Sequence, residues 1–405
     1  MTALDLPAQV RRARRRHQVT MLALVAPSIF FVALFFVAPL GLFLFRSVDN
    51  SEVPGWLPRT VAALSDWNGA GLPHEAAFRA LGEDLAALSG STALPLLGRR
   101  LNHNIPGFRS LITATGSRVD PRRDGSMREQ LLQIDARWGE PVYWQTIRRE
   151  RHVLTWFYLL TALDLRYGTA GGLERAPGES AIFLDLLGRT LGISAVVTLL
   201  CVLLGFPVAA TMAASSPARA NALLILVLVP FWTSLLVRST AWVILLQNQG
   251  VVNQALVGLG LIGKPVPLIF NRLGLYIAMV HVLLPFMVLP LYSVLKGIRP
   301  ELMRAAASLG APPWTAFLRV YVPQALPGLV AGASLVFVLA LGYYITPALV
   351  GGPGDQMIGY FIAYFTNTAV NWGMASALGT ILLLVVSLIY VALGRIVGLD
   401  RLVVR

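Results

Sequence analysis

Residues 298–323 read IRPELMRAAASLGAPPWTAFLRVYVP, and this stretch decides the fold because apolar spans lie on both sides of it. Pro300 suits the start of a short helix, and three consecutive alanines after Arg304 favour helix. Gly310 suits a C-terminal stop, and Pro312 and Pro313 forbid continuation. An ordinary linker between spans would not need residues that start and stop a helix. The stretch therefore predicts a loop helix whose small alanines let another protein approach closely.

The flanking sequence has the composition of a polytopic membrane protein. Of 405 residues, 56% are hydrophobic and 13% charged, against about 25% charged in soluble domains. This excludes a soluble enzyme and a disordered chain, and the single cysteine, Cys201, excludes a disulfide scaffold. A spanning helix needs about 20 apolar residues. On that scale we predict an all-α membrane protein with six spans, at 21–45, 186–213, 221–246, 274–296, 325–349 and 376–397.

The positive charges predict the orientation of these spans. The net charge is +13, and the arginines of residues 11–16 directly precede the first span. By the positive-inside rule, both termini are cytoplasmic. The first run is too long for a signal-peptide core, so we interpret it as an anchor. The predicted parts are a cytoplasmic N-terminus 1–20, helix 1 at 21–45, an extracytoplasmic helical insertion 46–180, a core 181–397 that includes the loop 298–323, and a cytoplasmic C-terminus 398–405.

The helical insertion (residues 46–180) differs from the rest, since it holds 15 of the 20 acidic residues. Helical pieces such as Glu75–Leu88 and Arg128–Arg137 are separated by Gly/Pro turns. Two interpretations stay open: a solvated helical cap, or a docking surface for an extracytoplasmic partner. The aromatic and apolar stretch Arg151–Arg166 is expected to lie along the outer membrane interface.

Five polar or aromatic residues in the predicted spans are candidates for a translocation path. A charge inside a span is costly and is often functional, although near an interface it can also snorkel. Each candidate has a plain alternative: snorkelling for the arginine, a hydrogen-bonded interior position for the histidine, and packing or gating for the aromatic side chains. The candidates are Arg238, His281, Trp232, Tyr343 and Tyr344.

The loop resembles the conserved cytoplasmic loop of binding-protein-dependent ABC importer permeases with the MetI-like type I fold. That signature is Glu-Ala-Ala, three residues, Gly, nine residues, then Ile-x-Leu-Pro. Aligned on Gly310, this chain matches the spacing throughout, with Arg304 where the family has Glu; Glu301, one turn earlier, is a candidate substitute. The resemblance implies that the residues meeting a partner ATPase are Glu301, Arg304, Ala305, Ala306, Ala307, Gly310 and Pro323.

Other segments are similar to the spermidine/putrescine-type permeases, namely LGFPVA at 204–209, PFWTSLLVRSTAW at 230–242, LPFMVLPLY at 284–292 and TPALVGGP at 346–353. The resemblance covers about 181–405 and the first span, but not the helical insertion. It implies a permease in the bacterial inner membrane, paired with a second homologous permease, an ATP-binding subunit dimer and a periplasmic binding protein. It also implies a chain that is not an enzyme and needs no cofactor or metal.

The cargo implied is a small cationic or zwitterionic nitrogen compound, such as a polyamine, an opine or an amino-acid relative. The alternative function is an ion-coupled secondary transporter, which predicts acidic residues within the spans. From residue 190 onward the acidic residues are Glu301, Asp355 and Asp400, all outside the predicted spans. This distribution favours the ATP-driven importer.

Overall fold

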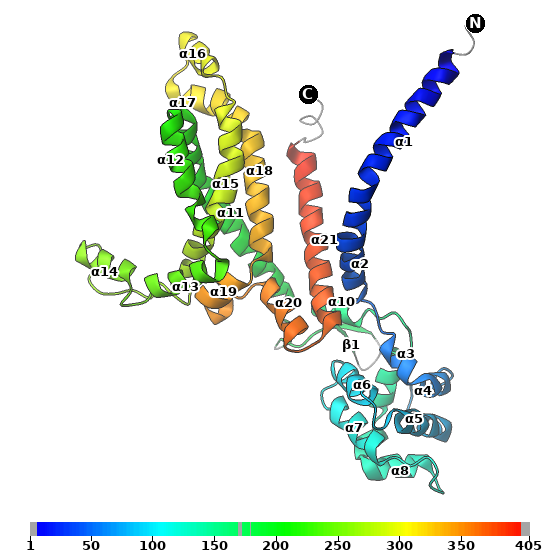
Figure 1. Ribbon diagram of the computed structural model, residues 1–405. Helices are drawn as coiled ribbons and strands as arrows, with labels where there is room; N and C mark the ends of the chain where they lie inside the picture. Colours follow the sequence, from blue (N-terminus) through cyan, green and yellow to red (C-terminus); the bar gives the residue numbers. More distant parts are fainter. Residues whose placement is uncertain (1–5, 169–171, 179, 398–405) are drawn as a thin grey trace. The chain divides into compact units, whose positions relative to one another are not determined.

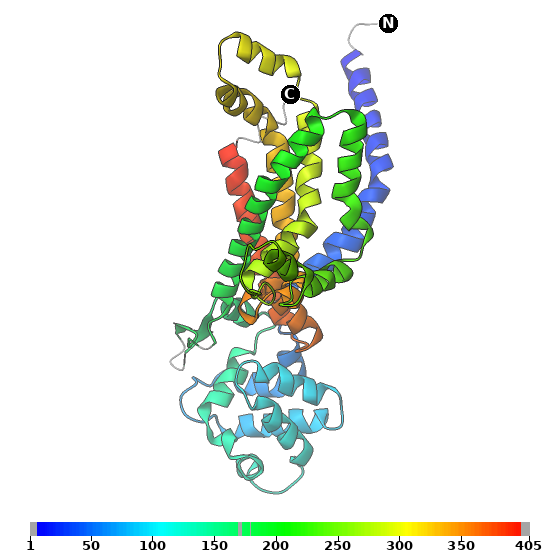
Figure 2. The ribbon, with the colours of Figure 1, turned by 90° about the vertical axis from the view of Figure 1, so that its left-hand side faces the viewer.

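The computed structural model describes residues 6–168, 172–178 and 180–397 (Figures 1 and 2). The chain divides into two compact units, residues 1–174 with 372–380, and residues 175–371 with 381–405. Almost all regular structure is helical, and the strands β1 (Leu165–Tyr167) and β2 (Leu173–Arg175) form a two-stranded sheet. The predicted all-α class is confirmed.

The first unit begins with a long apolar helix and continues into the helical insertion. A π-helical turn, η1, joins α1 to α2 just before Pro39, which has no N–H to continue the regular ladder. Its helices are α1 (Leu6–Val32), η1 (Ala33–Val37), α2 (Ala38–Phe45), α3 (Glu52–Trp56), α4 (Pro58–Ala63), α5 (Glu75–Leu88), α6 (Ala93–Asn102), α7 (Phe108–Arg118), α8 (Met127–Ile134), η2 (Ala136–Gly139), α9 (Pro141–Arg149) and α10 (Phe157–Ala162).

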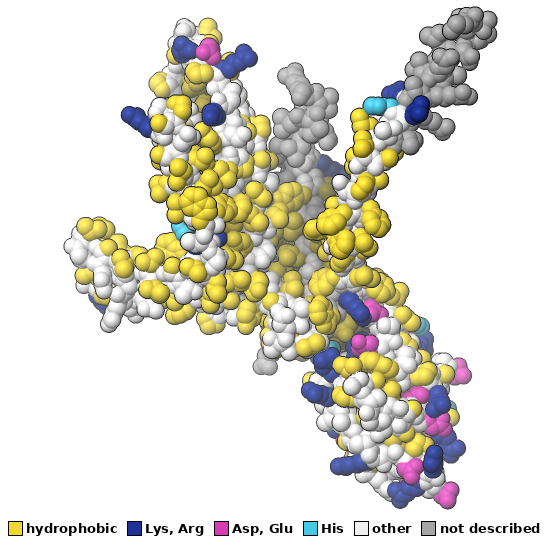
Figure 3. All heavy atoms as spheres, viewed as in Figure 1, with side chains coloured by type: hydrophobic (Ala, Val, Ile, Leu, Met, Phe, Trp, Pro, Cys, Tyr) yellow, Lys and Arg dark blue, Asp and Glu magenta, His cyan; other side chains and the backbone are white. Residues whose placement is uncertain are grey.

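The helical insertion has the interior of a water-soluble domain. Its predicted helix Glu75–Leu88 is confirmed with those bounds as α5. Trp138 and Trp144 are completely buried and their rings lie 5.3 Å apart. The Trp138 indole donates to the Thr115 hydroxyl at 2.8 Å, so its polar edge is satisfied inside the core. Charged side chains cover the outside, whereas residues 21–45 of α1, η1 and α2 present a hydrophobic surface (Figure 3).

A buried ion pair lies inside the insertion. The Arg100 guanidinium donates to the Glu150 carboxylate at 2.8 Å, and both side chains are 4% exposed. The Asn104 amide donates to the other Glu150 oxygen at 2.8 Å, and Arg100 also donates to Asn104 at 2.7 Å. The guanidinium stacks over the Tyr158 ring, 4.9 Å from its centroid. The pair therefore joins α6, α9 and α10 through hydrogen bonds that offset part of its desolvation.

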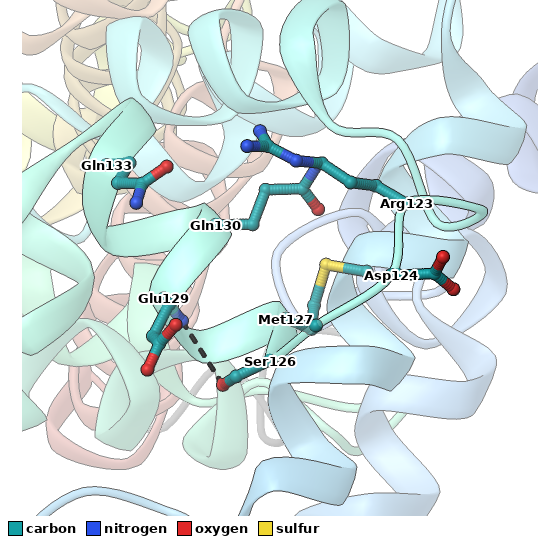
Figure 4. A pocket seen from close by; sticks show the side chains of 8 residues that line it. Arg123, Asp124, Ser126, Met127, Glu129, Gln130 and Gln133 are labelled. Carbon is teal, nitrogen blue, oxygen red and sulfur yellow. Dashed lines mark hydrogen bonds between the residues drawn. The ribbon is translucent and has the colours of Figure 1, made fainter.

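A small polar pocket lies beside the N-terminus of α8, between Arg123 and Gln133 (Figure 4). The Ser126 hydroxyl there accepts from the Glu129 amide at 3.4 Å, which is an N-cap. Ser126 also donates to the Glu75 carboxylate of α5 at 3.1 Å. Ser126 in this pocket thus serves as a helix cap.

The second unit is the membrane bundle. Its central helices α11, α15 and α18 pack on one another (Figures 1 and 2). The elements are α11 (Phe183–Ala214), α12 (Pro217–Leu228), η3 (Val229–Trp232), α13 (Leu235–Leu245), α14 (Val251–Gly258), α15 (Arg272–Lys296), α16 (Pro300–Ser308), α17 (Pro313–Ala316), η4 (Phe317–Tyr321), α18 (Val322–Gly342), α19 (Ile345–Val350), η5 (Pro353–Asp355) and α20 (Ile358–Asn367), followed by α21 (Trp372–Val397), whose first turns belong to the first unit.

The described residues contain five helices long and apolar enough to span a membrane, and six if one bent pair counts as one span. That pair is the predicted third span, 221–246, which is not a single straight helix. Residues Pro217–Trp232 and Leu235–Leu245 meet at 97°. The bend follows the 3-10 turn at Pro230, which lacks an N–H, and Ser234 caps the new helix by accepting from Val237 N at 3.2 Å.

The predicted fifth span, 325–349, also needs correction. Residues Pro313–Gly342 form the apolar span, and the chain then starts the separate short helix α19. Pro347 explains the break, because it has no N–H for the Tyr343 carbonyl and its ring would clash with that carbonyl in a continuous helix. The span therefore begins earlier and ends earlier than its hydropathy suggests.

Candidate functional site: the loop helix and the Arg238 cluster

The predicted loop helix is α16 (Pro300–Ser308), and both of its ends follow local rules. Pro300 occupies the first turn, and Glu301 places an acid there. Gly310 has φ +81°, and its N–H bonds to the Ala307 carbonyl at 3.0 Å. The Ala311 N–H bonds to the Ala306 carbonyl at 3.0 Å, which completes a Schellman motif. The predicted stop at Gly310 is confirmed.

The surface of α16 is unusual because apolar side chains face outward at its end. Leu309 is 89% exposed and Trp314, on α17, is 69% exposed. Ala305 and Ala307 are exposed, and Ala306 is half-buried. A Cβ at Gly310 would meet open space among the described residues. Exposed large apolar side chains next to small ones form a surface suited to contact with another protein.

The charged residues of α16 form an ion pair with each other. The Arg304 guanidinium donates to the Glu301 carboxylate at 2.7 Å, one helical turn apart. The side chains are 74% and 66% exposed, so water screens the pair and its effect on stability is about 0–1 kcal/mol. Arg304, the departure from the family signature, is thus accompanied on the same helix face by the acid that the sequence singled out.

An aromatic stack links the loop to the bundle. The rings of Trp314, Phe317 and Tyr321 stack in sequence, with centroids 5.8 and 5.7 Å apart. Phe206 of α11 contacts Phe317 edge-on at 6.0 Å. The stack runs along the π-helical turn η4 into α18, where Pro323 occupies the first turn. The stack therefore connects α17, which follows α16 in the chain, to α18 and α11.

Three of the five path candidates lie near one another. Arg238, on α13, carries a buried Nε with no hydrogen-bond partner among the described residues. Its charge lies within electrostatic reach of both His281 on α15 and Tyr343 at the end of α18. The Trp242 indole, one turn after Arg238, donates to His281 Nδ1 at 3.2 Å. Together these residues form the Arg238 cluster, which consists of Arg238, Trp242, His281 and Tyr343.

The other two candidates have different surroundings. Trp232 is 77% exposed at the bend between α12 and α13. Tyr344 is 42% exposed at the junction of α18 and α19. The sequence analysis did not identify Leu309 as a contact residue. A large apolar side chain between polar Ser308 and the stop at Gly310 could have indicated this role.

Comparison with known proteins places the chain in a family. The model of the family described as binding-protein-dependent transport system inner membrane component matches residues 168–400. The spermidine/putrescine transport system permease protein PotB of Haemophilus influenzae is 31% identical over 220 residues, covering 54% of this chain and 77% of that protein. The Escherichia coli (strain K12) PotB is 33% identical over 214 residues, covering 53% and 78%.

Two further comparisons concern an inner membrane permease and a solved transporter structure. The inner membrane ABC transporter permease protein YdcU of Escherichia coli (strain K12) is 33% identical over 232 residues, covering 54% of this chain and 73% of that protein. A crystal structure of a bacterial alginate ABC transporter, in complex with an alginate pentasaccharide-bound periplasmic protein, aligns with a TM-score of 0.41 at 21% identity, over 51% of this chain and 75% of that chain.

The chain therefore belongs to the family of binding-protein-dependent transport system inner membrane components. It is an ABC importer permease, a multi-pass protein of the inner membrane, and it resembles the polyamine permeases. This assignment sets the ion-coupled secondary transporter aside.

Proposed function

We propose that the chain is the membrane-spanning subunit of an ATP-driven importer for a small cationic or zwitterionic nitrogen compound. The cargo would be a polyamine, an opine or an amino-acid-like molecule delivered by a periplasmic binding protein. The relatives named for spermidine and putrescine support this class. A second homologous permease would complete the path, and ATP would be hydrolysed on a separate subunit dimer. The termini and α16 would face the cytoplasm, and the helical insertion would face outward.

The exposed helix α16 carries the proposal. Its alanines, its exposed Leu309 and the open space at Gly310 fit insertion into a groove on the ATP-binding subunit. The aromatic stack from Trp314 to Tyr321 provides a physical route from that groove to α18. Arg238, His281 and Tyr343 would contribute to the path, with Trp232 and Tyr344 as further lining residues.

Coupling is tested with Gly310→Asp. A Cβ at position 310 has no atom within 4 Å beyond its own residue and chain neighbours among the described residues, so we expect the obstruction to arise at a partner's surface. We expect normal expression and basal ATPase activity, with uptake abolished. Gly260→Asp is the matched control, since Gly260 also has a positive φ, +69°, and open space around it. Both variants carry the same backbone strain of roughly 1–2 kcal/mol. Normal uptake by Gly310→Asp would refute the coupling role.

The cargo and the partners are tested in proteoliposomes. The tagged chain is purified gently from its native membranes, and its partners are identified by mass spectrometry. We expect an ATP-binding subunit and a second permease. The assembly is then supplied with its binding protein and with radiolabelled putrescine, spermidine, octopine or lysine. ATP-dependent uptake of one of them supports the class, whereas uptake of none of them, alongside intact binding-protein stimulation of ATPase activity, shows that the class is wrong.

A further inference from the structure

An exposed apolar strip lies on the surface of the helical insertion. Val153, Leu154 and Trp156 are 55%, 58% and 65% exposed, and Leu163 is 39% exposed. The same part of the chain buries twenty apolar residues in its own core. An insertion that packs its interior so completely has enough chain to cover these four side chains, yet they are left outside. They therefore form a surface to which something else binds.

The backbone places this strip beside the end of a membrane span. Asp49 and Leu154 form an antiparallel bridge. The Asn50 N–H bonds to the Val153 carbonyl and the Thr155 N–H to the Val48 carbonyl, each at 2.8 Å. Val48 follows three residues after Phe45, the last residue of the apolar span Arg16–Phe45. Paired strands lie roughly 4.8 Å apart, so Leu154 is held within about 10–15 Å of the end of the span.

The chemistry around the strip suits the surface of a bilayer. The polar interfacial layer is roughly 5–8 Å deep on each side of the hydrocarbon core. Tryptophan is enriched there, with its ring at the level of the headgroups. Arg46, which pairs with Asp49 at 2.7 Å, is 56% exposed in the same turn as the bridge, and Arg151 precedes the strip by two residues. The exposed apolar face of α2, at Leu42 and Phe45, leads directly into this region.

We propose that residues 153–163 are a membrane-interface anchor that rests the helical insertion on the bilayer. Trp156 and its apolar neighbours enter the boundary between headgroups and acyl chains, and the arginines lie at the lipid phosphates. The anchor lies within the first unit, and its only premise is that Arg16–Phe45 spans the membrane. It does not depend on the cargo or on the coupling role of α16. Its partner is the bilayer surface at the end of α2.

The depth of the strip can be measured directly, because the chain has a single cysteine, Cys201, which is buried. In a Cys201→Ala background, the full chain in lipid nanodiscs is spin-labelled at Leu154→Cys or Trp156→Cys. Collision of the label with oxygen, which dissolves in lipid, is compared with collision with a water-soluble nickel chelate. Leu42→Cys on the span is the lipid reference, and Ser117→Cys, exposed on α7, is the water reference.

We expect labels at 154 and 156 to favour oxygen over nickel, between the two references and nearer to position 42. Adding Trp156→Asp should move the label at 154 toward the water reference, whereas Trp156→Phe should leave it unchanged. Labels at 154 and 156 that match position 117 in the nanodisc would overturn the anchor. Labels that exclude both oxygen and nickel once the partner subunits assemble, but not before, would show that a protein covers the strip instead.

Discussion

The helical insertion and the loop helix α16 both lie outside the apolar spans, and they treat similar residues in opposite ways. Trp138 is completely buried, whereas Trp314 is 69% exposed. The ion pair Arg100–Glu150 has an N–O distance of 2.8 Å at 4% exposure, while Glu301–Arg304 has 2.7 Å at 66–74% exposure. The insertion satisfies its own side chains, whereas α16 and the adjoining α17 present theirs outward. Similar contacts therefore stabilise the fold in one region and are available to a partner in the other.

The largest expected difference is between the two tryptophans. Trp138→Ala leaves a cavity and removes the indole donor to the Thr115 hydroxyl, so we expect the free energy of unfolding of the insertion to fall by about 3–5 kcal/mol. Trp314→Ala should cause no measurable loss of stability in the insertion. Hydrogen–deuterium exchange of the α7 and α9 amides measures both effects. Equal protection of these amides in the two variants would contradict the comparison.

The two ion pairs extend the comparison of buried and exposed side chains to charged residues. Glu150→Gln leaves the Arg100 guanidinium buried without a counter-charge, and we expect a loss of about 3 kcal/mol in the insertion. Glu301→Gln removes an exposed partner and should cost less than about 1 kcal/mol. Thermal unfolding of the two variants, monitored by protease sensitivity, measures the two losses of stability. The double variant Arg100→Leu/Glu150→Leu should recover part of the loss, because no lone charge remains inside.

The insertion should also respond to acid through His103. Burial, and then the charges of Arg100 and Arg99, lower the pKa of His103 to about 4. Between about pH 6.5 and pH 4 the unfolded chain binds a proton that the folded chain does not bind, so stability falls as the pH falls through this window, by at most about 3 kcal/mol. We expect His103→Gln to remove this part of the pH dependence of exchange in α6. His74→Gln, at an exposed position, should preserve it.

The smallest effect on folding is expected at Leu309. Leu309→Ala should change the thermal stability of the chain by less than about 0.5 kcal/mol, since the side chain is 89% exposed. It should instead weaken co-purification of the ATP-binding subunit. Leu97→Ala, in the core of the insertion, is the matched control and should cost about 2–5 kcal/mol of stability while leaving that association intact. Full association with Leu309→Ala would show that α16 does not use this side chain.

Much of the fold follows from local patterns. Runs of apolar residues predict the spans, and Pro300 and Gly310 predict the bounds of α16, because helix starts and stops depend on the φ angles and hydrogen bonds of a few adjacent residues. The family motif extended this prediction to the partners. The same local chemistry was present at Pro230 and Pro347, but hydropathy alone does not distinguish a kinked span from a broken one.

The sequence by itself thus determined that this is an all-α membrane protein with a permease core and a loop helix of defined start and stop. The tertiary structure decided which side chains meet, such as Arg100 with Glu150 across fifty residues and Trp242 with His281. It also paired the backbone of Leu154 with that of Asp49, which follows α2. It also decided that Leu309 stays exposed while Leu97 is buried. Local rules act through neighbours in the chain, whereas burial and pairing depend on the packing of segments far apart in sequence.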